Sequence, residues 1–421
     1  MNLKLILSLL LLLPLFAHSQ QIDQLILNRH YQEALTQLDN QISHQPSAAL
    51  YFKKGVVLEK MMDFVGAIKA LGNACRMNTT ETTYLEELAD ANSSLGNYMD
   101  AIACLKQAVQ LAPKNLVLQG KLAHTYLELK AYHDAFDWYQ KIYQQDSTNS
   151  YYNRYYAYAA YKNGKLGLAA ILYEQMVHDH SRDLNSYLNL ATIYGKLGMG
   201  SKTERENFEM KAEWALYQGL KVFPRQPALT LKLGDTYFLF KDYGRAQHPY
   251  EQYLADNDSI FDVLKNYAIC LYFTDYEKDA LAILQKCYQM NLNDPIVNFY
   301  LGACYKKLKL FPESEGYLLL AIESATPSYL AEIYHHLGQV YGLERKYKES
   351  IDAYKKAMEL DPMKVELLFQ IATTYEEYNF NKTLALNYYK MYLKEAGDQA
   401  RNADYALDRI KKIKEDLFFE K

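Results

Sequence analysis

Three short stretches of the sequence carry residue types that could do chemistry. Residues 195–203, GKLGMGSKT, have the glycine spacing of a phosphate-binding loop, but Ser201 stands where that loop needs lysine and no strand pattern precedes it. The stretch HDH places His178 and His180 two residues apart, so they do not share a helix face, and no further metal ligands accompany them. Gly-x-Ser-x-Gly and His-Glu-x-x-His motifs are also absent, so the sequence predicts no catalytic residues, no metal site and no bound cofactor.

The third stretch, residues 150–164 (SYYNRYYAYAAYKNG), combines six tyrosines with the cations Arg154 and Lys162. Tyrosine rings are rigid stacking surfaces, and a cation beside a ring can hold a carboxylate through charge-assisted hydrogen bonds. Such a surface suits an extended peptide or a C-terminal carboxylate, and the same rings could stack on sugars. Tyrosine is common throughout the chain, at 40 of 421 residues. Which of these rings are exposed therefore depends on the helices in which they lie.

Composition favours a helical protein that does not bind nucleic acid. A chain of 421 residues is long enough for two or three domains or for one extended array, and its 10 prolines are few. The formal net charge of −4, without long runs of one sign, argues against nucleic acid as a partner. The five cysteines form no Cys-x-x-Cys pair, which leaves zinc ribbons and thioredoxin-like chemistry without support.

The N-terminus has the pattern of a secretory signal. Lys4 provides a basic start, Leu5 to Phe16 form an apolar run too short to cross a bilayer, and Ala17 and Ser19 are small residues at the positions that a signal peptidase reads. We expect residues 1–19 to be a cleaved signal peptide, with an uncleaved membrane anchor as the alternative. The chain is then exported, to the periplasm if the source is a Gram-negative bacterium, or secreted.

Two columns of small residues recur along the chain, mostly at intervals of 34 residues. Such a period is the signature of a repeat architecture. The first column is Ala67, Ala101, Ala135, Ala169, Ala212, Ala246, Ala280, Ser314, Ser350 and Ala385. The second is Gly55, Ala89, Ala123, Ala157, Ala191, Gly234, Ala268, Gly302, Gly338 and Ala372.

The pattern resembles the tetratricopeptide repeat, a helix–turn–helix unit of 34 residues. The clearest copy is YHHLGQVYGLERKYKESIDAYKKAMELDP at 334–362, and LGACY at 301–305 repeats its signature. Small residues let the two helices of a unit approach closely, and stacked neighbours bury the apolar faces. The resemblance implies an all-α, right-handed superhelical α-solenoid. We expect a partial repeat at 20–47, about ten repeats at 48–398 and a C-terminal capping helix at 399–421.

Two departures from the period bear on the architecture. The spacing from Ala191 to Ala212 is longer by nine residues, which predicts either extended helices or a projecting loop near 198–211. Pro249 falls inside a second helix, where it removes a backbone hydrogen bond and should kink or shorten that helix.

The resemblance assigns part of the tyrosine stretch to a binding groove. In tetratricopeptide repeats the concave groove is lined by first-helix positions that here correspond to Tyr151, Arg154, Tyr158, Tyr161 and Lys162, with His124 from the preceding repeat and Asn185, Thr192 and Lys196 from the following one. Tyr152 and Tyr156 fall at packing positions, and Tyr155 points elsewhere. Equivalent groove positions farther along are Phe238, Lys265, Tyr272, Phe299 and Lys306. The lysine-and-asparagine carboxylate clamp of chaperone-binding members is not reproduced in register.

These features predict a non-catalytic scaffold or adaptor of the cell envelope that binds a peptide segment of another protein in the concave groove. The alternative is an accessory protein whose aromatic groove binds glycans or another ligand. The expected partners are proteins and not nucleic acid, and the chain would meet a membrane only through an uncleaved signal or a partner. The sequence leaves the oligomeric state open.

Overall fold

The computed structural model describes residues 21–200, 203–257, 259–324, 327–378, 381–397 and 400–419. Every regular element in these ranges is a helix, so the expected all-α fold is confirmed. The expected signal peptide, residues 1–19, lies outside the described residues. Among the helices of the described ranges, none combines the length and the apolar character needed to span a membrane.

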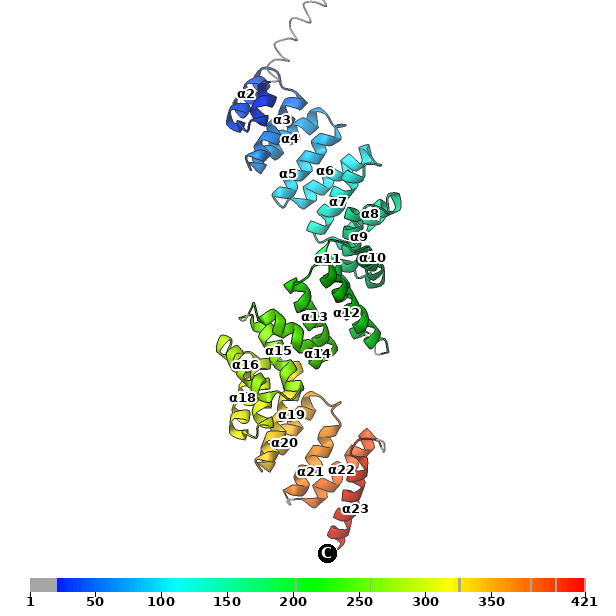
Figure 1. Ribbon diagram of the computed structural model, residues 1–421, viewed down its shortest axis with the longest axis vertical. Helices are drawn as coiled ribbons and strands as arrows, with labels where there is room; N and C mark the ends of the chain where they lie inside the picture. The colour runs from blue at the N-terminus through cyan, green and yellow to red at the C-terminus, as the bar shows by residue number, and fades with distance from the viewer. Residues whose placement is uncertain are drawn as a thin grey trace, which may run out of the picture. The chain divides into compact units, whose positions relative to one another are not determined.

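The chain divides into two units, Met1–Leu197 and Gly198–Lys421. In the first unit, residues 21–27 are helical and are followed by alternating helices that pack in pairs (Figure 1). These helices are α2 (Tyr31–His44), α3 (Ala48–Lys60), α4 (Phe64–Met77), α5 (Thr82–Ser94), α6 (Tyr98–Leu111), α7 (Leu116–Glu128), α8 (Tyr132–Gln145), α9 (Ser150–Lys162), α10 (Leu166–His178) and α11 (Leu184–Gly200), whose last turn crosses the unit boundary.

The second unit continues the same alternation and ends on a single helix. Its helices are α12 (Arg205–Val222), α13 (Pro227–Phe240), α14 (Tyr243–Leu254), α15 (Phe261–Phe273), α16 (Glu277–Met290), α17 (Pro295–Lys307), α18 (Phe311–Ser324), α19 (Pro327–Leu343), α20 (Tyr347–Leu360), α21 (Glu366–Glu377), α22 (Lys382–Ala396) and α23 (Ala403–Phe419). The last of these, α23, packs against α22, in the position expected for a capping helix.

The small residues of the two columns are all buried, and they lie where the helices of a pair meet. The hydroxyl of Ser314 donates to the carbonyl oxygen of Gly302 at 2.7 Å, and that of Ser350 donates to the carbonyl of Gly338 at 2.7 Å. A Cβ atom at Gly338 would lie 2.6 Å from ring atoms of Tyr354, which leaves no room for a larger residue. The columns therefore set the close approach of the two helices.

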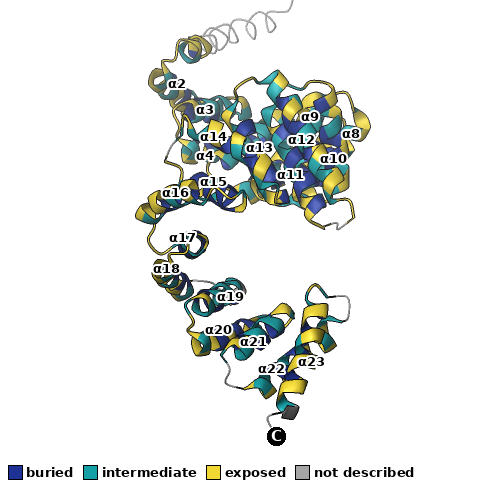
Figure 2. Cartoon of the chain, turned by 60° about the horizontal axis from the view of Figure 1, so that its bottom comes forward, coloured by how far each residue is buried: buried dark blue, intermediate teal, exposed yellow. Residues whose placement is uncertain are grey.

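Neighbouring pairs complete the burial. From α2 to α10 and from α12 to α23, each helix packs against the next one along the chain. First helices of successive pairs also touch, at α3 with α5, α7 with α9, α15 with α17 and α17 with α19. Figure 2 shows buried residues on the helix faces that meet and exposed residues on the outer faces, as expected when stacking neighbours supply the core.

The backbone conformation of the turn between the two helices of a pair also recurs along the chain. Left-handed φ angles of +60° to +78° recur in these turns, at Met62, Gly96, Lys130, Gly164, Lys241, Asp275, Lys309 and Arg345. A left-handed residue ends the first helix and turns the chain into the second. Only two of these positions are glycine, so the sequence pattern did not reveal them.

The structure shows how the chain accommodates the two departures from the repeat period. The additional residues near 198–211 lengthen helices on both sides, since α11 has 17 residues and α12 has 18. Residues 201 and 202 between these two helices are outside the described ranges. Pro249 lies inside α14, which has only 12 residues.

Candidate functional site

The helix α9 is held in place by capping and by packing of two of its tyrosines. The side-chain oxygen of Asn149 accepts hydrogen bonds from the backbone N–H groups of Tyr151 at 3.1 Å and Tyr152 at 3.3 Å, which starts the helix. The ring of Tyr152 packs against Gly120 of α7, where a Cβ atom would lie 2.4 Å from the ring. Tyr156 is buried. Tyr152 and Tyr156 therefore anchor the helix, as the register predicts.

Six further side chains of α9 form one face together with residues of α7 and α11. Positions 151, 154, 155, 158, 161 and 162 are three or four residues apart, so they follow one side of the helix. We call the set the tyrosine face: Tyr151, Arg154, Tyr155, Tyr158, Tyr161 and Lys162 of α9, His124 of α7 and Lys196 of α11. All eight residues are half-buried or exposed.

Aromatic contacts join α7 to α9 across this face. The ring of His124 meets the ring of Tyr155 edge-on, with centroids 5.2 Å apart, and Tyr155 is 5.0 Å from Tyr151. On its other side Tyr155 stacks on Tyr139 of α8 at 5.8 Å. The repeat register placed Tyr155 away from the groove, yet it contacts two groove residues. A ring four residues after Tyr151 on the same helix face was the signal that could have identified it.

Cations lie over the rings of the tyrosine face. The guanidinium of Arg154 is 5.5 Å from the ring centroid of Tyr151 and 5.1 Å from that of Tyr155, and it forms an ion pair with Asp183 at 3.8 Å. Lys162 lies 5.3 Å from the ring of Tyr158 and 5.5 Å from Tyr161. These distances are within the range of cation–π attraction.

The ring of Tyr161 has two ammonium groups beside it. Besides Lys162, Lys196 of α11 places its Nζ atom 4.8 Å from the ring centroid. In the described ranges, neither lysine has a carboxylate within ion-pair distance. The face therefore presents unpaired positive charge next to ring surfaces and phenol hydroxyls, an arrangement that can bind a carboxylate.

Tyr151 of the face and Tyr139 beneath it keep their protons at neutral pH. Burial and a hydrogen bond to Tyr155 raise the pKa of Tyr151. Burial likewise raises the pKa of Tyr139, which lies beneath Tyr155. These two phenols are thus neutral hydrogen-bonding groups, and their rings keep the negative faces that attract cations.

Two expected groove residues of α11 are not drawn into these contacts. Asn185 is exposed in the first turn of α11. The hydroxyl of Thr192 donates to the carbonyl oxygen of Leu188 at 2.7 Å, so it is already used within its own helix. The structure therefore brings together seven of the nine predicted residues and adds Tyr155.

In the second unit, the side chains at the equivalent groove positions are buried or paired with other side chains of that unit. Tyr272 and Phe299 are buried, and Lys265 pairs with Asp262 at 3.1 Å and Asp294 at 3.4 Å. The ring of Phe299 contacts those of Tyr300 and Tyr329 of the same unit. This set is internally satisfied, in contrast to the tyrosine face.

Lys306 belongs to a half-buried polar cluster in the second unit. Its ammonium donates to Oε1 of Gln339 at 2.6 Å and to Nδ1 of His336 at 2.9 Å, so Nε2 of His336 carries the proton that faces Glu332 at 3.3 Å. Burial lowers the pKa of Lys306 to about 8. Hydrogen bonding to His336 and Lys364 lowers the pKa of Glu332 to about 2. Since the donors and acceptors are paired with each other, this cluster is a structural network.

The described part of the glycine-rich stretch and the histidine pair noted in the sequence lie in helices and turns of the repeats. Residues 195–200 continue α11 as a helix and form no loop. His178 ends α10, and His180 follows in a turn with a φ angle of 51°. Within the described part of the chain, no three histidine, cysteine or acidic side chains gather closely enough to hold a metal ion.

Comparison with known proteins matches parts of the chain to one repeat family. Residues 87–150 and 331–362 match the tetratricopeptide repeat. The BBSome complex member BBS4 of Mus musculus is 29% identical over 114 residues, which are 27% of this chain and 21% of that protein. The small glutamine-rich tetratricopeptide repeat-containing protein 2 of Mycosarcoma maydis is 32% identical over 87 residues, 21% of this chain and 25% of that protein.

The matched segment thus spans about a fifth to a quarter of the length of these relatives. Among solved structures, a chain of the APC/C hetero-tetramer Cut9-Hcn1 aligns with 93% of this chain and 88% of its own length, at 14% identity and a TM-score of 0.45. The two family matches show that the chain contains tetratricopeptide repeats, over residues 87–150 in the first unit and 331–362 in the second.

Proposed function

We propose that this chain is a non-catalytic scaffold that holds an extended, acidic segment of another protein on the tyrosine face. Tetratricopeptide repeats act in protein–protein interaction, and this chain contains them. The observation that carries the proposal is the pair of ammonium groups, from Lys162 and Lys196, that flank the ring of Tyr161 without a carboxylate partner in the described ranges.

An acidic peptide fits this face better than a neutral one. A carboxylate of the segment would pair with the two lysines and replace part of their hydration, while neighbouring apolar groups would lie on the rings of Tyr151 and Tyr158. Tyrosine side chains have few rotatable bonds, so ordering them on binding loses little conformational entropy. Arg154 already pairs with Asp183, so it would contribute mainly through its stacking on Tyr151.

We further propose that the protein acts in the cell envelope or outside the cell. The support is the pattern of residues 1–19, with a basic start, a short apolar run and small residues before Gln20. Fractionation of cells that express the full chain tests this point, since the mature protein should begin at Gln20 and be found in the exported fraction. A full-length protein in the cytosol would contradict it.

Selection from a random peptide library tests the binding proposal. Purified protein should enrich peptides rich in aspartate and glutamate. The double variant Lys162→Ala/Lys196→Ala should bind the selected peptides about tenfold more weakly, and added salt should weaken the wild-type complex.

The matched control removes the same charge from other helices of the same unit. Lys141 lies over the ring of Trp138 at 4.1 Å, and Lys165 lies over Phe136 at 4.6 Å. The variant Lys141→Ala/Lys165→Ala should bind like wild type. Equal loss in both double variants, or enrichment of peptides without acidic residues, would refute the assignment. Selective binding of neutral oligosaccharides in place of peptides would favour the accessory glycan-binding role.

A further inference from the structure

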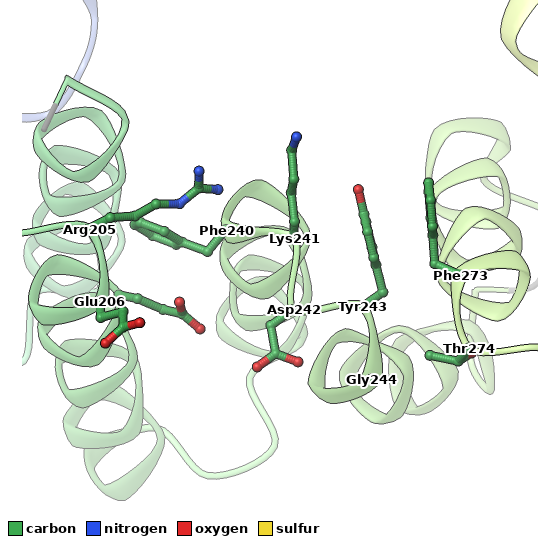
Figure 3. Close-up of a pocket in the computed structure, with 10 residues that line it drawn as sticks. Arg205, Glu206, Phe240, Lys241, Asp242, Tyr243, Gly244, Phe273 and Thr274 are labelled. Atoms are coloured by element: carbon green, nitrogen blue, oxygen red, sulfur yellow. The ribbon is translucent and has the colours of Figure 1, made fainter. Parts of the chain in front are cut away.

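The second unit contains a cavity of about 520 Å³ that the tyrosine face does not include. It lies at the turns between helices, and its walls come from the start of α12, the turn between α13 and α14, and the end of α15. A volume of this size is within the range of small-ligand sites. Figure 3 shows side chains from these elements around one space.

The cavity depends on the nine additional residues of the repeat period. Regular second helices begin three residues before the small residue of the first column, as α14 does at Tyr243 before Ala246. Helix α12 begins at Arg205, seven residues before Ala212, so it has one extra turn at its start. That turn carries Arg205 and Glu206 into the cavity wall. The insertion therefore builds a feature that the regular second helices do not have.

Aromatic rings form the apolar part of the wall. Tyr243 and Phe273 stack face to face with centroids 4.3 Å apart and planes at 9°, and Phe273 is 46% exposed. The guanidinium of Arg205 lies 5.7 Å from the ring of Phe240. In Figure 3 Tyr243 stands between Phe273 on one side and Lys241 with Phe240 on the other. One ring face of Tyr243 is thus covered by Phe273. The ring of Phe238 also meets Tyr243 at 73°, with centroids 5.7 Å apart, and the part of Tyr243 that stays exposed lines the cavity.

The charges of the wall are separated into two groups. In Figure 3 the guanidinium of Arg205 and the ammonium of Lys241 point to one side, and the carboxylates of Glu206 and Asp242 point to the other. Asp242 is already held by Arg245, at 2.6 Å, as is Glu209 at 2.6 Å.

Of the cations in this wall, Lys241 has the fewest interactions with other described residues. It is exposed, it has a left-handed φ angle of 65°, and among the described residues it has no ion-pair or hydrogen-bond partner through its side chain. The Arg205 guanidinium contacts Phe240 and donates to the carbonyl oxygen of Leu239 only at 3.4 Å. The side of the cavity next to the tyrosine hydroxyl therefore offers positive charge to a ligand.

We propose that this cavity binds a peptide segment in which an aromatic side chain lies next to a carboxylate. The aromatic ring of the segment packs on the exposed part of Tyr243, and the carboxylate pairs with Arg205 and Lys241. A neutral sugar fits less well, because it gives Arg205 and Lys241 no anionic partner. This second site is in the other unit and does not rest on the proposal for the tyrosine face.

Fluorescence anisotropy with defined peptides tests the proposal. The probe is a labelled nonapeptide with Asp-Phe-Asp at its centre and glycine and serine on both sides. Full-length protein carrying Lys162→Ala/Lys196→Ala is the background, so that the tyrosine face cannot account for binding. The probe should bind at least about tenfold more tightly than versions with Asn-Phe-Asn, Asp-Ala-Asp or Lys-Phe-Lys.

Substitutions in the wall locate the complex. Arg205→Ala/Lys241→Ala should weaken binding of the probe at least about tenfold, and Phe273→Ala should weaken it less. The matched control is Lys309→Ala, because Lys309 has the same left-handed turn position, with a φ angle of 63°, beside a second helix of regular length. Far-UV circular dichroism checks that each variant remains folded.

Three outcomes would overturn the assignment. They are absence of binding of the probe up to about 1 mM, equal binding of the Asp-Ala-Asp peptide, and an equal effect of Lys309→Ala and Arg205→Ala/Lys241→Ala. Binding of an acidic oligosaccharide such as oligogalacturonate, with no binding of the peptides, would overturn the peptide as the ligand.

Discussion

Gly338 provides the sharpest test of how the repeats pack. It lies on α19 where that helix meets α20, and a Cβ atom there would be 2.6 Å from Cδ1 and Cε1 of Tyr354 and 3.1 Å from its Cγ. Carbon atoms in favourable contact are about 3.5–4.0 Å apart. Tyr354 is 5% exposed, so its ring has little space into which to move. The variant Gly338→Ala should therefore force the two helices apart.

A second glycine serves as the control that separates the overpacking at position 338 from the general effect of replacing glycine by alanine in a helix. Gly316 lies within α18 of the same unit, and no atom would lie within 4 Å of a Cβ there. Alanine in place of glycine inside a helix adds about 0.5–1 kcal/mol of stability through conformational entropy. That gain is common to both variants, so it cancels in their difference. What remains is the overpacking at position 338, about 1–3 kcal/mol.

Urea unfolding followed by far-UV circular dichroism measures the difference. Gly316→Ala should raise the midpoint relative to wild type, and Gly338→Ala should lie below Gly316→Ala by the overpacking term. Because repeat proteins can unfold in parts, hydrogen exchange of α19 and α20 should show where the loss occurs. If Gly338→Ala is as stable as Gly316→Ala, the close approach of the helices is not what the small residue provides.

Two electrostatic predictions follow from the second unit. Burial lowers the pKa of Lys306 from 10.5 to about 8, so the unfolded chain holds this proton more tightly, and folding stability should rise by about 1.5 kcal/mol between about pH 8 and 9.5. Lys306→Met should remove this rise in thermal unfolding measured against pH, and an unchanged slope would contradict the assignment. Arg245→Ala leaves Glu209 and Asp242 without their cation and should cost about 1–2 kcal/mol at pH 7. The cost should shrink near pH 4.5, where Glu209, whose pKa is raised by burial, takes up a proton, and urea midpoints at the two pH values would detect a cost that does not change.

The fold could be predicted from the sequence because packing restricts residue size at fixed intervals. Small residues such as Ala135 and Gly338 stand where two helices nearly touch, and a stack of similar helix pairs requires them at a regular interval, which here is mostly 34 residues. The register that follows from these positions also identified the packing of Tyr152 and Tyr156.

The register could not reveal what depends on contacts between different helices. Tyr155 joins the tyrosine face because the rings of His124 and Tyr151 lie beside it, and a position within one repeat does not encode that. Conversely, Phe299 occupies a groove position by register but is buried under Tyr329 and its neighbours. Side chains of adjacent repeats decide which groove positions stay open.

The cavity beside α12 is a second feature that the register could not identify. The insertion was visible in the sequence, but its residues could have formed a loop or longer helices. Only the extra helical turn at Arg205 brings a cation opposite the stacked rings of Tyr243 and Phe273. The insertion in the repeat period thus indicated where the chain departs from a regular repeat, but not which side chains would line a cavity there.

The central claim, that the tyrosine face binds another protein, is tested most directly by photocrosslinking in cells that make the full chain. A photoreactive phenylalanine derivative replaces Tyr158 in one strain and Trp138, on α8 of the same unit, in a control strain. Illumination should link position 158 to a discrete partner through an acidic segment of that partner, identified by mass spectrometry, and Lys162→Ala/Lys196→Ala should abolish the adduct. A partner captured from position 138 but not from position 158 would contradict the claim.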